Sequence, residues 1–290
     1  MVQLPQCLVG MEACGGSHHW ARKFKAYGHK VRLIPPQYVN PYVKRHKNDS
    51  VDAEAICEAV GRPNMRFAAI KSVDQQEIIS LHRIRGLAVT NRTALVNQIR
   101  GLLHEYGIVF PKGIKQARRR IVEIIADEKN GLGDYFRVML EDERGELARL
   151  DERIATYEKE ITLLSQDDAS CRLLMTIPGV GPITATALLA SIGDVRAFRN
   201  GRELAAWIGL VPGQHSTGGK TSLSGISKRG DIYLRTLLIH GARSVLRMAH
   251  RKEDKRNRWA SSLKERRGPN IAAVALANKM ARSAWAMLYK

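Results

Sequence analysis

The sequence predicts a chain of three parts: an α/β N-terminal domain, a long helical coiled-coil arm, and an all-α C-terminal domain. Three observations support this division: a strand–helix–strand pattern in the first 36 residues, a heptad repeat in the middle, and a Pro-Gly-Val-Gly-Pro turn between helical segments near residue 180. We place the parts at residues 1–68, 69–168 and 169–290. A chain of 290 residues is long enough for more than one hydrophobic core.

The N-terminal pattern predicts a βαβ unit. Residues 7–13 read CLVGMEA, an apolar run that suits a buried strand, and residues 29–36 read HKVRLIPP, a second strand that ends at two prolines. An amphipathic segment between them predicts a helix, so the two strands should pair in parallel. Two short helices are expected next, at about 37–46 and 49–60.

The middle of the chain predicts two long helices joined by a compact excursion. The second helix carries apolar residues at heptad spacing over three to four repeats, which is typical of a coiled coil. Two interpretations remain open: a plain helical hairpin within a globular domain, or an extended arm that spaces two domains or pairs two protomers. The apolar seam consists of Leu140, Leu147, Leu150, Ile154, Tyr157, Ile161 and Leu164.

The charge of the chain favours an acidic partner. The net charge is +19, and residues 196–290 hold 20 Lys and Arg against 5 Asp and Glu, a local excess of +15. Nucleic acid is the first candidate partner, and a solvated cationic surface is the alternative. The four cysteines show no zinc spacing, and we find neither a membrane-length apolar run nor a signal peptide. A cytoplasmic protein is expected.

The Pro-Gly-Val-Gly-Pro turn resembles a helix-hairpin-helix element. Gly179 and Gly181 permit a tight turn, and the first N–H groups of the following helix could hold a DNA phosphate. A tight corner chosen for packing is the alternative. Basic residues that we expect to contact nucleic acid are Lys44, Arg45, Lys47, Lys220, Lys228, Arg229 and Arg235.

Acidic residues near the N-terminus predict a metal site. Asp49 and Asp52 are three residues apart, so they project from one helical edge, and Glu12 ends an apolar strand where an unpaired acid would be costly. Carboxylate oxygens are the ligands that Mg²⁺ prefers. In the alternative interpretation Asn48 or Asp49 is an N-cap, and Asp52 complements the helix dipole.

Ser216 is a candidate nucleophile in the segment QHSTGGK. Small neighbours expose its hydroxyl, and nearby cations could accept a phosphate. His215 is a candidate base, although adjacency in sequence does not establish geometry. A polar loop without chemistry is the alternative.

Several segments together resemble the DEDD-type insertion-sequence transposases. The N-terminal segment is similar to their catalytic domain, and three later segments are similar to their C-terminal transposase domain. They follow one another in the order found in that family. The segments are residues 9–72, 173–194, 198–220 and 225–243.

The resemblance implies more than the residues do alone. It implies a RuvC-like N-terminal domain of the ribonuclease-H type, with four acids that bind Mg²⁺, of which the last three match Glu12, Asp49 and Asp52. It implies a serine that attacks a DNA phosphodiester and becomes covalently joined to DNA. Ser216 matches this serine, and Thr217 is the alternative register.

It further implies a structured noncoding guide RNA and a homo-oligomer whose active sites are shared between protomers. No acid precedes Glu12. We therefore expect the chain to be N-terminally truncated, with only part of the RuvC-like domain, and to be impaired as a transposase. An inactive nucleic-acid-binding remnant and a RuvC-like junction nuclease are the alternative functions.

Overall fold

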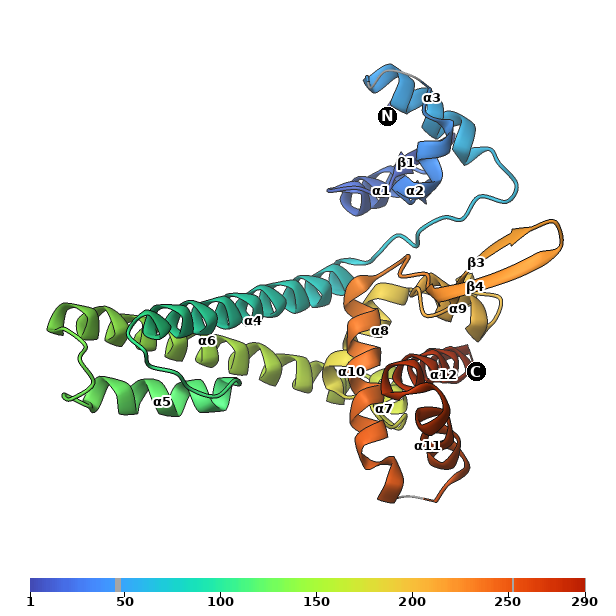
Figure 1. Cartoon of the computed structure of the whole chain (residues 1–290). Helices are drawn as coiled ribbons and strands as arrows, with labels where there is room; N and C mark the ends of the chain where they lie inside the picture. The colour runs from blue at the N-terminus through green and yellow to red at the C-terminus, as the bar shows by residue number, and fades with distance from the viewer. Residues whose placement is uncertain (45–47, 252, 290) are drawn as a thin grey trace.

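The computed structural model describes residues 1–44, 48–251 and 253–289. An N-terminal unit (β1 to α3), an arm (α4 to α6) and a C-terminal domain (α7 to α12) follow one another along the chain (Figure 1). A separate cluster of buried apolar side chains lies within each of them. No helix in these described ranges is both long enough and apolar enough to span a membrane.

The N-terminal unit contains the predicted βαβ pattern. Strand β1 (Leu8–Glu12) pairs in parallel with β2 (Lys30–Ile34), from Leu8 opposite Lys30 to Glu12 opposite Ile34. This confirms the predicted parallel pair. The helices of the unit are α1 (Ser17–Ala26), α2 (Pro36–Val39), the 3-10 turn η1 (Asn40–Tyr42) and α3 (Asp49–Val60).

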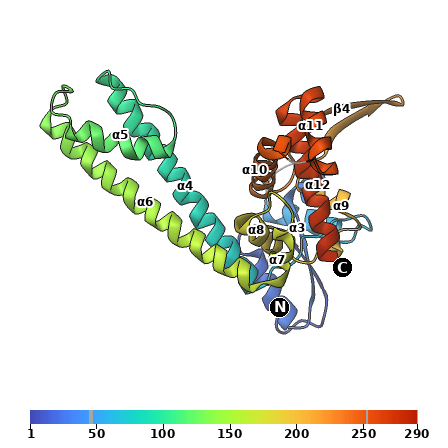
Figure 2. The ribbon, with the colours of Figure 1, turned by 90° about the horizontal axis from the view of Figure 1, so that it is seen from below.

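The arm consists of two long helices and a shorter one. Helices α4 (Val73–Glu105) and α6 (Asp134–Asp167) pack along each other, and α5 (Ile114–Ala126) covers them near the far end. Both views show the arm extending well beyond the rest of the molecule (Figures 1 and 2), which is the predicted extended form rather than a hairpin within a globular domain. Supercoiling of the helices stays a prediction. Buried members of the seam are Leu140, Leu147, Leu150, Ile154 and Ile161.

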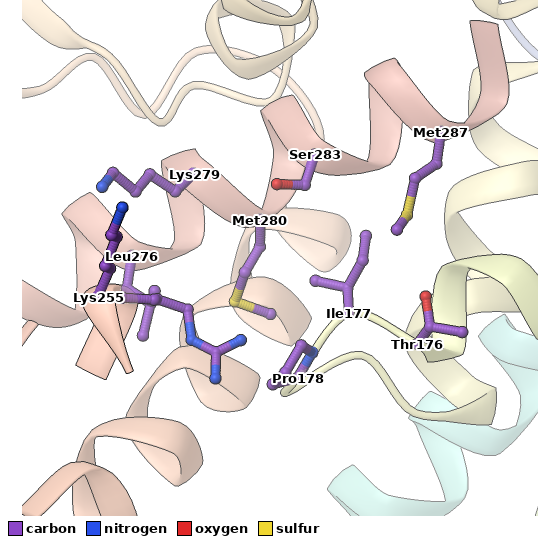
Figure 3. A pocket seen from close by; sticks show the side chains of 10 residues that line it. Thr176, Ile177, Pro178, Lys255, Leu276, Lys279, Met280, Ser283 and Met287 are labelled. Atoms are coloured by element: carbon purple, nitrogen blue, oxygen red, sulfur yellow. The ribbon is translucent and has the colours of Figure 1, made fainter. Parts of the chain in front are cut away.

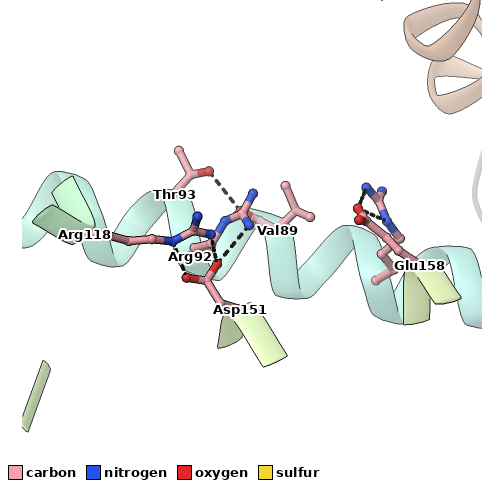
Figure 4. A network of polar contacts seen from close by, with 7 residues as sticks. Val89, Arg92, Thr93, Arg118, Asp151 and Glu158 are labelled. Atoms are coloured by element: carbon pink, nitrogen blue, oxygen red, sulfur yellow. Dashed lines mark hydrogen bonds and ion pairs between the residues drawn. The ribbon is translucent and has the colours of Figure 1, made fainter. Parts of the chain in front are cut away.

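A charged cluster joins the three helices of the arm. Asp151 of α6 accepts hydrogen bonds from Arg92 of α4 at 3.1 Å and from Arg118 of α5 at 2.6 and 2.5 Å (Figure 4). Burial would raise the pKa of Asp151, but the hydrogen bonds from Arg118 and Arg92 outweigh it and hold the pKa below its usual range. Farther along α4, Arg85 donates from Nε to Glu158 of α6 at 3.1 Å.

The C-terminal domain has a large helical core. Its helices α8, α10 and α12 supply most of the fully buried side chains, which are mainly Ala and Leu. Small side chains allow helices to approach closely, so this composition suits a compact bundle. The elements are α7 (Ala169–Met175), α8 (Pro182–Ile192), η2 (Val195–Ala197), α9 (Gly201–Trp207), α10 (Ile232–Met248), η3 (Ala249–Arg251), α11 (Lys255–Arg267) and α12 (Pro269–Tyr289).

A β-hairpin interrupts this helical domain, so the prediction of an all-α domain was wrong. Strands β3 (Pro212–Thr217) and β4 (Lys220–Ile226) are antiparallel. Gly218 and Gly219 connect them with φ of 56° and 76°. Two successive positive φ values are those of a type I′ turn, which matches the twist of a two-stranded ribbon. The hairpin projects from the domain in both views (Figures 1 and 2).

A buried histidine joins the arm to the C-terminal domain. His82 of α4 is 3% exposed, and its two ring nitrogens lie 3.0 Å from the Tyr233 hydroxyl of α10 and 2.9 Å from the Thr186 hydroxyl of α8. Burial, and then the positive charge of Arg85, lower the pKa of His82 to about 4. The ring is therefore neutral at pH 7, and both of its nitrogens have partners.

Candidate active site and nucleic-acid interface

The predicted acids lie along one strand–helix edge of the N-terminal unit. A Cβ added to Gly10 of β1 would lie 3.0 Å from Val60 and 3.2 Å from Ile56, so this face of β1 packs against α3. Alternate residues of a strand share a face, so Glu12 lies on the face that contacts α3. Asp52 and Asp49 lie one and two turns before Ile56, on the same side of α3.

The acids also have a structural role, which was the alternative interpretation. Asn48 caps α3 by accepting a hydrogen bond from the Val51 N–H at 2.8 Å, and Asp49 and Asp52 occupy the first turn. Negative charge there complements the helix dipole. The donor chemistry suits a divalent ion, since all three groups are carboxylates. Across the described residues, however, no group of three His, Cys, Asp or Glu side chains is close enough to hold a metal ion.

Ser216 lies near the tip of the hairpin and is exposed. Its hydroxyl accepts a hydrogen bond from Gln214 Nε2 at 2.8 Å, and Thr221 lies opposite it on β4. His215 points to the other face, because neighbouring residues of a strand alternate. The hairpin geometry therefore does not place His215 as a base for Ser216.

Thr217 lies on the opposite face of the hairpin from Ser216. Its cross-strand partner is Lys220, and it shares that face with His215, which pairs with Ser222. A base and a cation therefore flank Thr217, whereas the neighbours of Ser216 are an amide and a hydroxyl. If Thr217 rather than Ser216 is the nucleophile, His215 and Lys220 are the side chains on its face that could assist it.

Exposed cations lie at the two ends of the hairpin. Lys220 begins β4, and Lys228 and Arg229 follow its end. Lys228 has φ of 54°, an uncommon conformation for a residue other than glycine. The other predicted basic run is less open: Lys44 is exposed but pairs with Glu54, and Arg45 and Lys47 lie outside the described residues.

Arg235 lies inside the C-terminal domain rather than on its surface. It is 8% exposed and donates from Nη1 to the Ile208 carbonyl at 2.9 Å. A guanidinium held in this way supports the root of the hairpin and does not reach a nucleic acid. Arg235 is therefore not part of an exposed nucleic-acid-binding surface, in contrast to the prediction from sequence.

The Pro-Gly-Val-Gly-Pro turn packs closely against α10 at its first glycine, and at its second glycine it leaves the N-terminus of α8 without a side-chain cap. Gly179 has φ of 90°, and an added Cβ would lie 2.8 Å from the Gly241 carbonyl oxygen of α10. Gly179 is therefore required for packing, as the alternative interpretation held. Gly181 precedes α8 and has open space around it, with no side-chain cap on the helix. Phosphate binding at this helix start stays a prediction.

The two candidate catalytic regions lie apart within one chain. The tip of the β3–β4 hairpin is separated from β1 and α3 in both views (Figures 1 and 2). Residues that the sequence alone did not single out are Lys255, Arg256 and Lys279, which line one pocket. They come from two helices, and no local spacing relates them.

The fold and these sites define a basic, largely helical protein with an acidic N-terminal edge and a projecting hydroxyl-bearing hairpin. Two family models match the chain. A transposase model of the DEDD type matches residues 2–108, and the model of the IS116/IS110/IS902 transposase family matches residues 171–258.

Several relatives are similar in sequence to this protein over nearly its whole length. A probable family 20 transposase of Pseudomonas aeruginosa is 52% identical over 287 residues, which cover 99% of this chain and 85% of the relative. The transposase for insertion sequence element IS1111A of Coxiella burnetii is 49% identical over 97% of this chain and 77% of its own length. That for IS1328 of Yersinia enterocolitica is 42% identical, over 97% and 83%. The chain therefore belongs to the IS116/IS110/IS902 family of transposases.

Proposed function

We propose that this protein is the transposase of an insertion sequence, which binds DNA and cuts and rejoins its strands. The observation that carries the proposal is the hairpin: it presents the Ser216 hydroxyl on an exposed strand, and exposed cations lie at both ends of the same hairpin. The serine oxygen would bond to a DNA phosphorus while the bond from that phosphorus to one sugar oxygen breaks, which leaves one strand end joined to the protein and the other with a free hydroxyl. Attack of a DNA hydroxyl on the same phosphorus would then rejoin the strands and release the serine.

The proposal assigns Glu12, Asp49 and Asp52 to binding of a divalent metal ion, Mg²⁺ by resemblance. The packing of β1 on α3 supports the assignment, because it brings the two elements that carry these acids together, although no three acidic side chains among the described residues lie close enough to hold a metal ion. A bound ion would supply charge stabilisation at the phosphodiester.

DNA binding should be electrostatic and centred on the C-terminal part. Residues 196–290 carry an excess of +15, and Lys220, Lys228 and Arg229 are exposed there. For duplex DNA, log affinity should fall by about 0.9 per unit of log salt for each phosphate neutralised. The helix start after Gly181 would add a contact that does not depend on sequence.

The proposal extends to partners. A structured noncoding RNA from the element would guide the protein to DNA. A homo-oligomer would unite the hairpin of one protomer with the acidic edge of another. The separation of these regions within one chain supports such sharing, and the long arm is a suitable spacer. In this proposal the N-terminal domain comprises residues 1–68, the arm residues 69–168 and the C-terminal domain residues 169–290.

One observation favours a second candidate function, a nucleic-acid-binding protein without strand-cutting activity. The acids are not gathered into a metal site across the described residues, while the basic surface is intact. Such a protein would bind DNA with the same salt dependence and leave it uncut.

A strand-cleavage assay separates the two functions. The purified chain, RNA transcribed from the sequence beside its gene, and a plasmid that carries the same region are incubated with Mg²⁺. Transposase function predicts nicked or rejoined plasmid that disappears with Asp52→Asn. The matched control is Asp142→Asn, an exposed acid on α6. Plasmid that stays intact with the unaltered chain would favour the binding protein.

A further inference from the structure

A pocket with a cationic end and an apolar floor lies beside the Pro-Gly-Val-Gly-Pro turn. Its volume is about 450 Å³, within the range of small-ligand sites. The turn supplies one wall, the start of α11 a second and α12 the floor (Figure 3). Its lining residues are Thr176, Ile177, Pro178, Lys255, Arg256, Leu276, Lys279, Met280, Ser283 and Met287.

The charge at one end of the pocket suits a phosphate. The ammonium groups of Lys255 and Lys279 lie at one end in Figure 3, with Ile177 and Thr176 at the other. None of the described residues that line the pocket is acidic, and neither lysine forms an ion pair within the described chain. Lys279 instead lies over the Trp259 ring, 3.6 Å from its centroid. Both positive charges are therefore available to an anionic ligand.

Arg256 adds a third positive charge to this wall. Its Nε is buried and has no hydrogen-bond partner in the part of the chain that the structure describes. The neighbouring acid, Asp254, lies 3.8 Å from the guanidinium, and it accepts hydrogen bonds from the backbone N–H groups of Arg256 and Asn257. The Nε atom has almost no exposed surface, so a ligand does not reach it, and Arg256 contributes the positive charge of its guanidinium to the wall.

The floor suits an unpaired base rather than a duplex. Met287, which is half-buried, and Pro178, which is exposed, offer apolar surface to a ligand, whereas Met280 and Ile177 are buried. Duplex DNA keeps the faces of its bases stacked inside, so it offers no base face to cover this floor. A single strand can place a base there and its phosphates on the cations.

We propose that this pocket binds one unpaired nucleotide of a single-stranded nucleic acid. Its base lies on Met287 and Pro178, and its phosphates contact Lys255 and Lys279. The inference rests on the proposed function, since strand exchange and a guide RNA both expose single strands. DNA and RNA share the chemistry that the pocket recognises, so the test includes both.

Fluorescence anisotropy with the full-length chain tests the proposal. The probes are labelled oligothymidylate, oligouridylate and a DNA duplex of equal length, at one salt concentration. The variant Lys255→Ala/Lys279→Ala should lose about tenfold in affinity for a single strand. It should lose no more for the duplex than the matched variant Lys264→Ala/Arg266→Ala, which removes the same charge from exposed positions outside the pocket. Loss on oligouridylate alone identifies RNA as the ligand.

Cross-linking provides a second measurement that does not depend on a variant. Oligonucleotides that carry a photoreactive thiouracil should cross-link to peptides that contain residues 176–178 or 283–287. Equal losses for single strand and duplex in the pocket variant, or cross-links confined to other peptides, would overturn the pocket while DNA cutting stands. A chain that binds neither probe type would overturn both proposals.

Discussion

The acidic edge and the hairpin position their chemistry in different ways. Glu12 is held by a strand that packs on α3 through Gly10, and Asp49 and Asp52 belong to the first turn of that helix. Ser216, in contrast, lies on a two-stranded ribbon whose residues are almost all exposed. An isolated hairpin gains little stability from its own contacts.

This difference indicates that the hairpin, rather than the acidic edge, moves when the two regions come together. The position of the acids is set by packing within the N-terminal unit, whereas the tip of the hairpin is constrained mainly at its root, where Arg235 binds the Ile208 carbonyl. We expect the hairpin to take its working position when DNA or a second protomer contacts it. The positions of the acids follow from the fold of the N-terminal unit, but the position from which the serine would approach them does not.

The largest effect is expected at Ser216, the proposed nucleophile. Ser216→Ala should abolish the covalent protein–DNA adduct, a loss of at least about a hundredfold, because a methyl group cannot attack phosphorus. Thr217→Val removes the neighbouring hydroxyl at nearly the same volume and should leave the adduct in place. Denaturing gels of labelled DNA measure the adduct. An adduct that survives Ser216→Ala and vanishes with Thr217→Val would move the nucleophile to the face that carries His215 and Lys220.

The junction between arm and C-terminal domain should respond to pH. The pKa of His82 is lowered from 6.5 to about 4, so the unfolded chain binds more protons between these values. Neutral His82 should make its full contribution to the free energy of unfolding above pH 6.5. That free energy should fall by up to about 3 kcal/mol as the pH decreases toward 4. Urea unfolding at several pH values measures it. His82→Gln, which does not titrate, should be less stable at pH 7 and lose this component. An unchanged pH dependence in the variant would contradict the assignment.

Two glycines test the packed edge against the open ribbon. Gly10→Val inserts a side chain between β1 and α3, where an added Cβ already lies 3.0 Å from Val60, and should destabilise the N-terminal unit by about 2 kcal/mol. Gly225→Val makes the same change in β4, where a Cβ added to Gly225 would meet no neighbouring atom within 4 Å. It should alter the free energy of unfolding by less than about 0.5 kcal/mol. Thermal unfolding and amide exchange of β1 and α3 measure both. Equal effects would show that the two regions are packed alike.

The smallest effect should come from the arm. Asp151→Ala removes the acceptor shared by Arg92 and Arg118 and should cost about 1 kcal/mol, since the group is partly exposed and screened. Asp142→Ala, an exposed acid of the same helix, is the control. Urea midpoints measure the difference. A variant as stable as the control would mean that apolar packing alone holds α5 on the arm.

The elements that were predicted from sequence are those with one face packed against a neighbouring element. Strands β1 and β2 are rich in apolar residues, and α6 carries a seam of which Leu147 and Ile154 are typical, so the period of the pattern predicts the structure. The hairpin has no such pattern because neither of its faces is covered. Its indication was the turn chemistry of Gly218 and Gly219, which favours a two-residue loop.

Site residues divide in the same way. The spacing of Asp49 and Asp52 predicts a common helical side, because the helix itself fixes that relation. The burial of Arg235 depends on a carbonyl 27 residues away, and the meeting of Lys255 with Lys279 depends on how α11 packs on α12. No local pattern encodes such contacts.

The central claim is that the serine of the hairpin and the acids of the N-terminal unit act together, each from a different protomer. Mixing two inactive variants tests it most directly: Ser216→Ala, which keeps the acids, and Asp52→Asn, which keeps the serine. In a shared site the Asp52→Asn hairpin faces the intact acids of its Ser216→Ala partner. We predict that the mixture recovers part of the strand cleavage, with the adduct on the Asp52→Asn chain alone. A mixture that stays inactive, although both variants are folded and bind DNA, would contradict the account.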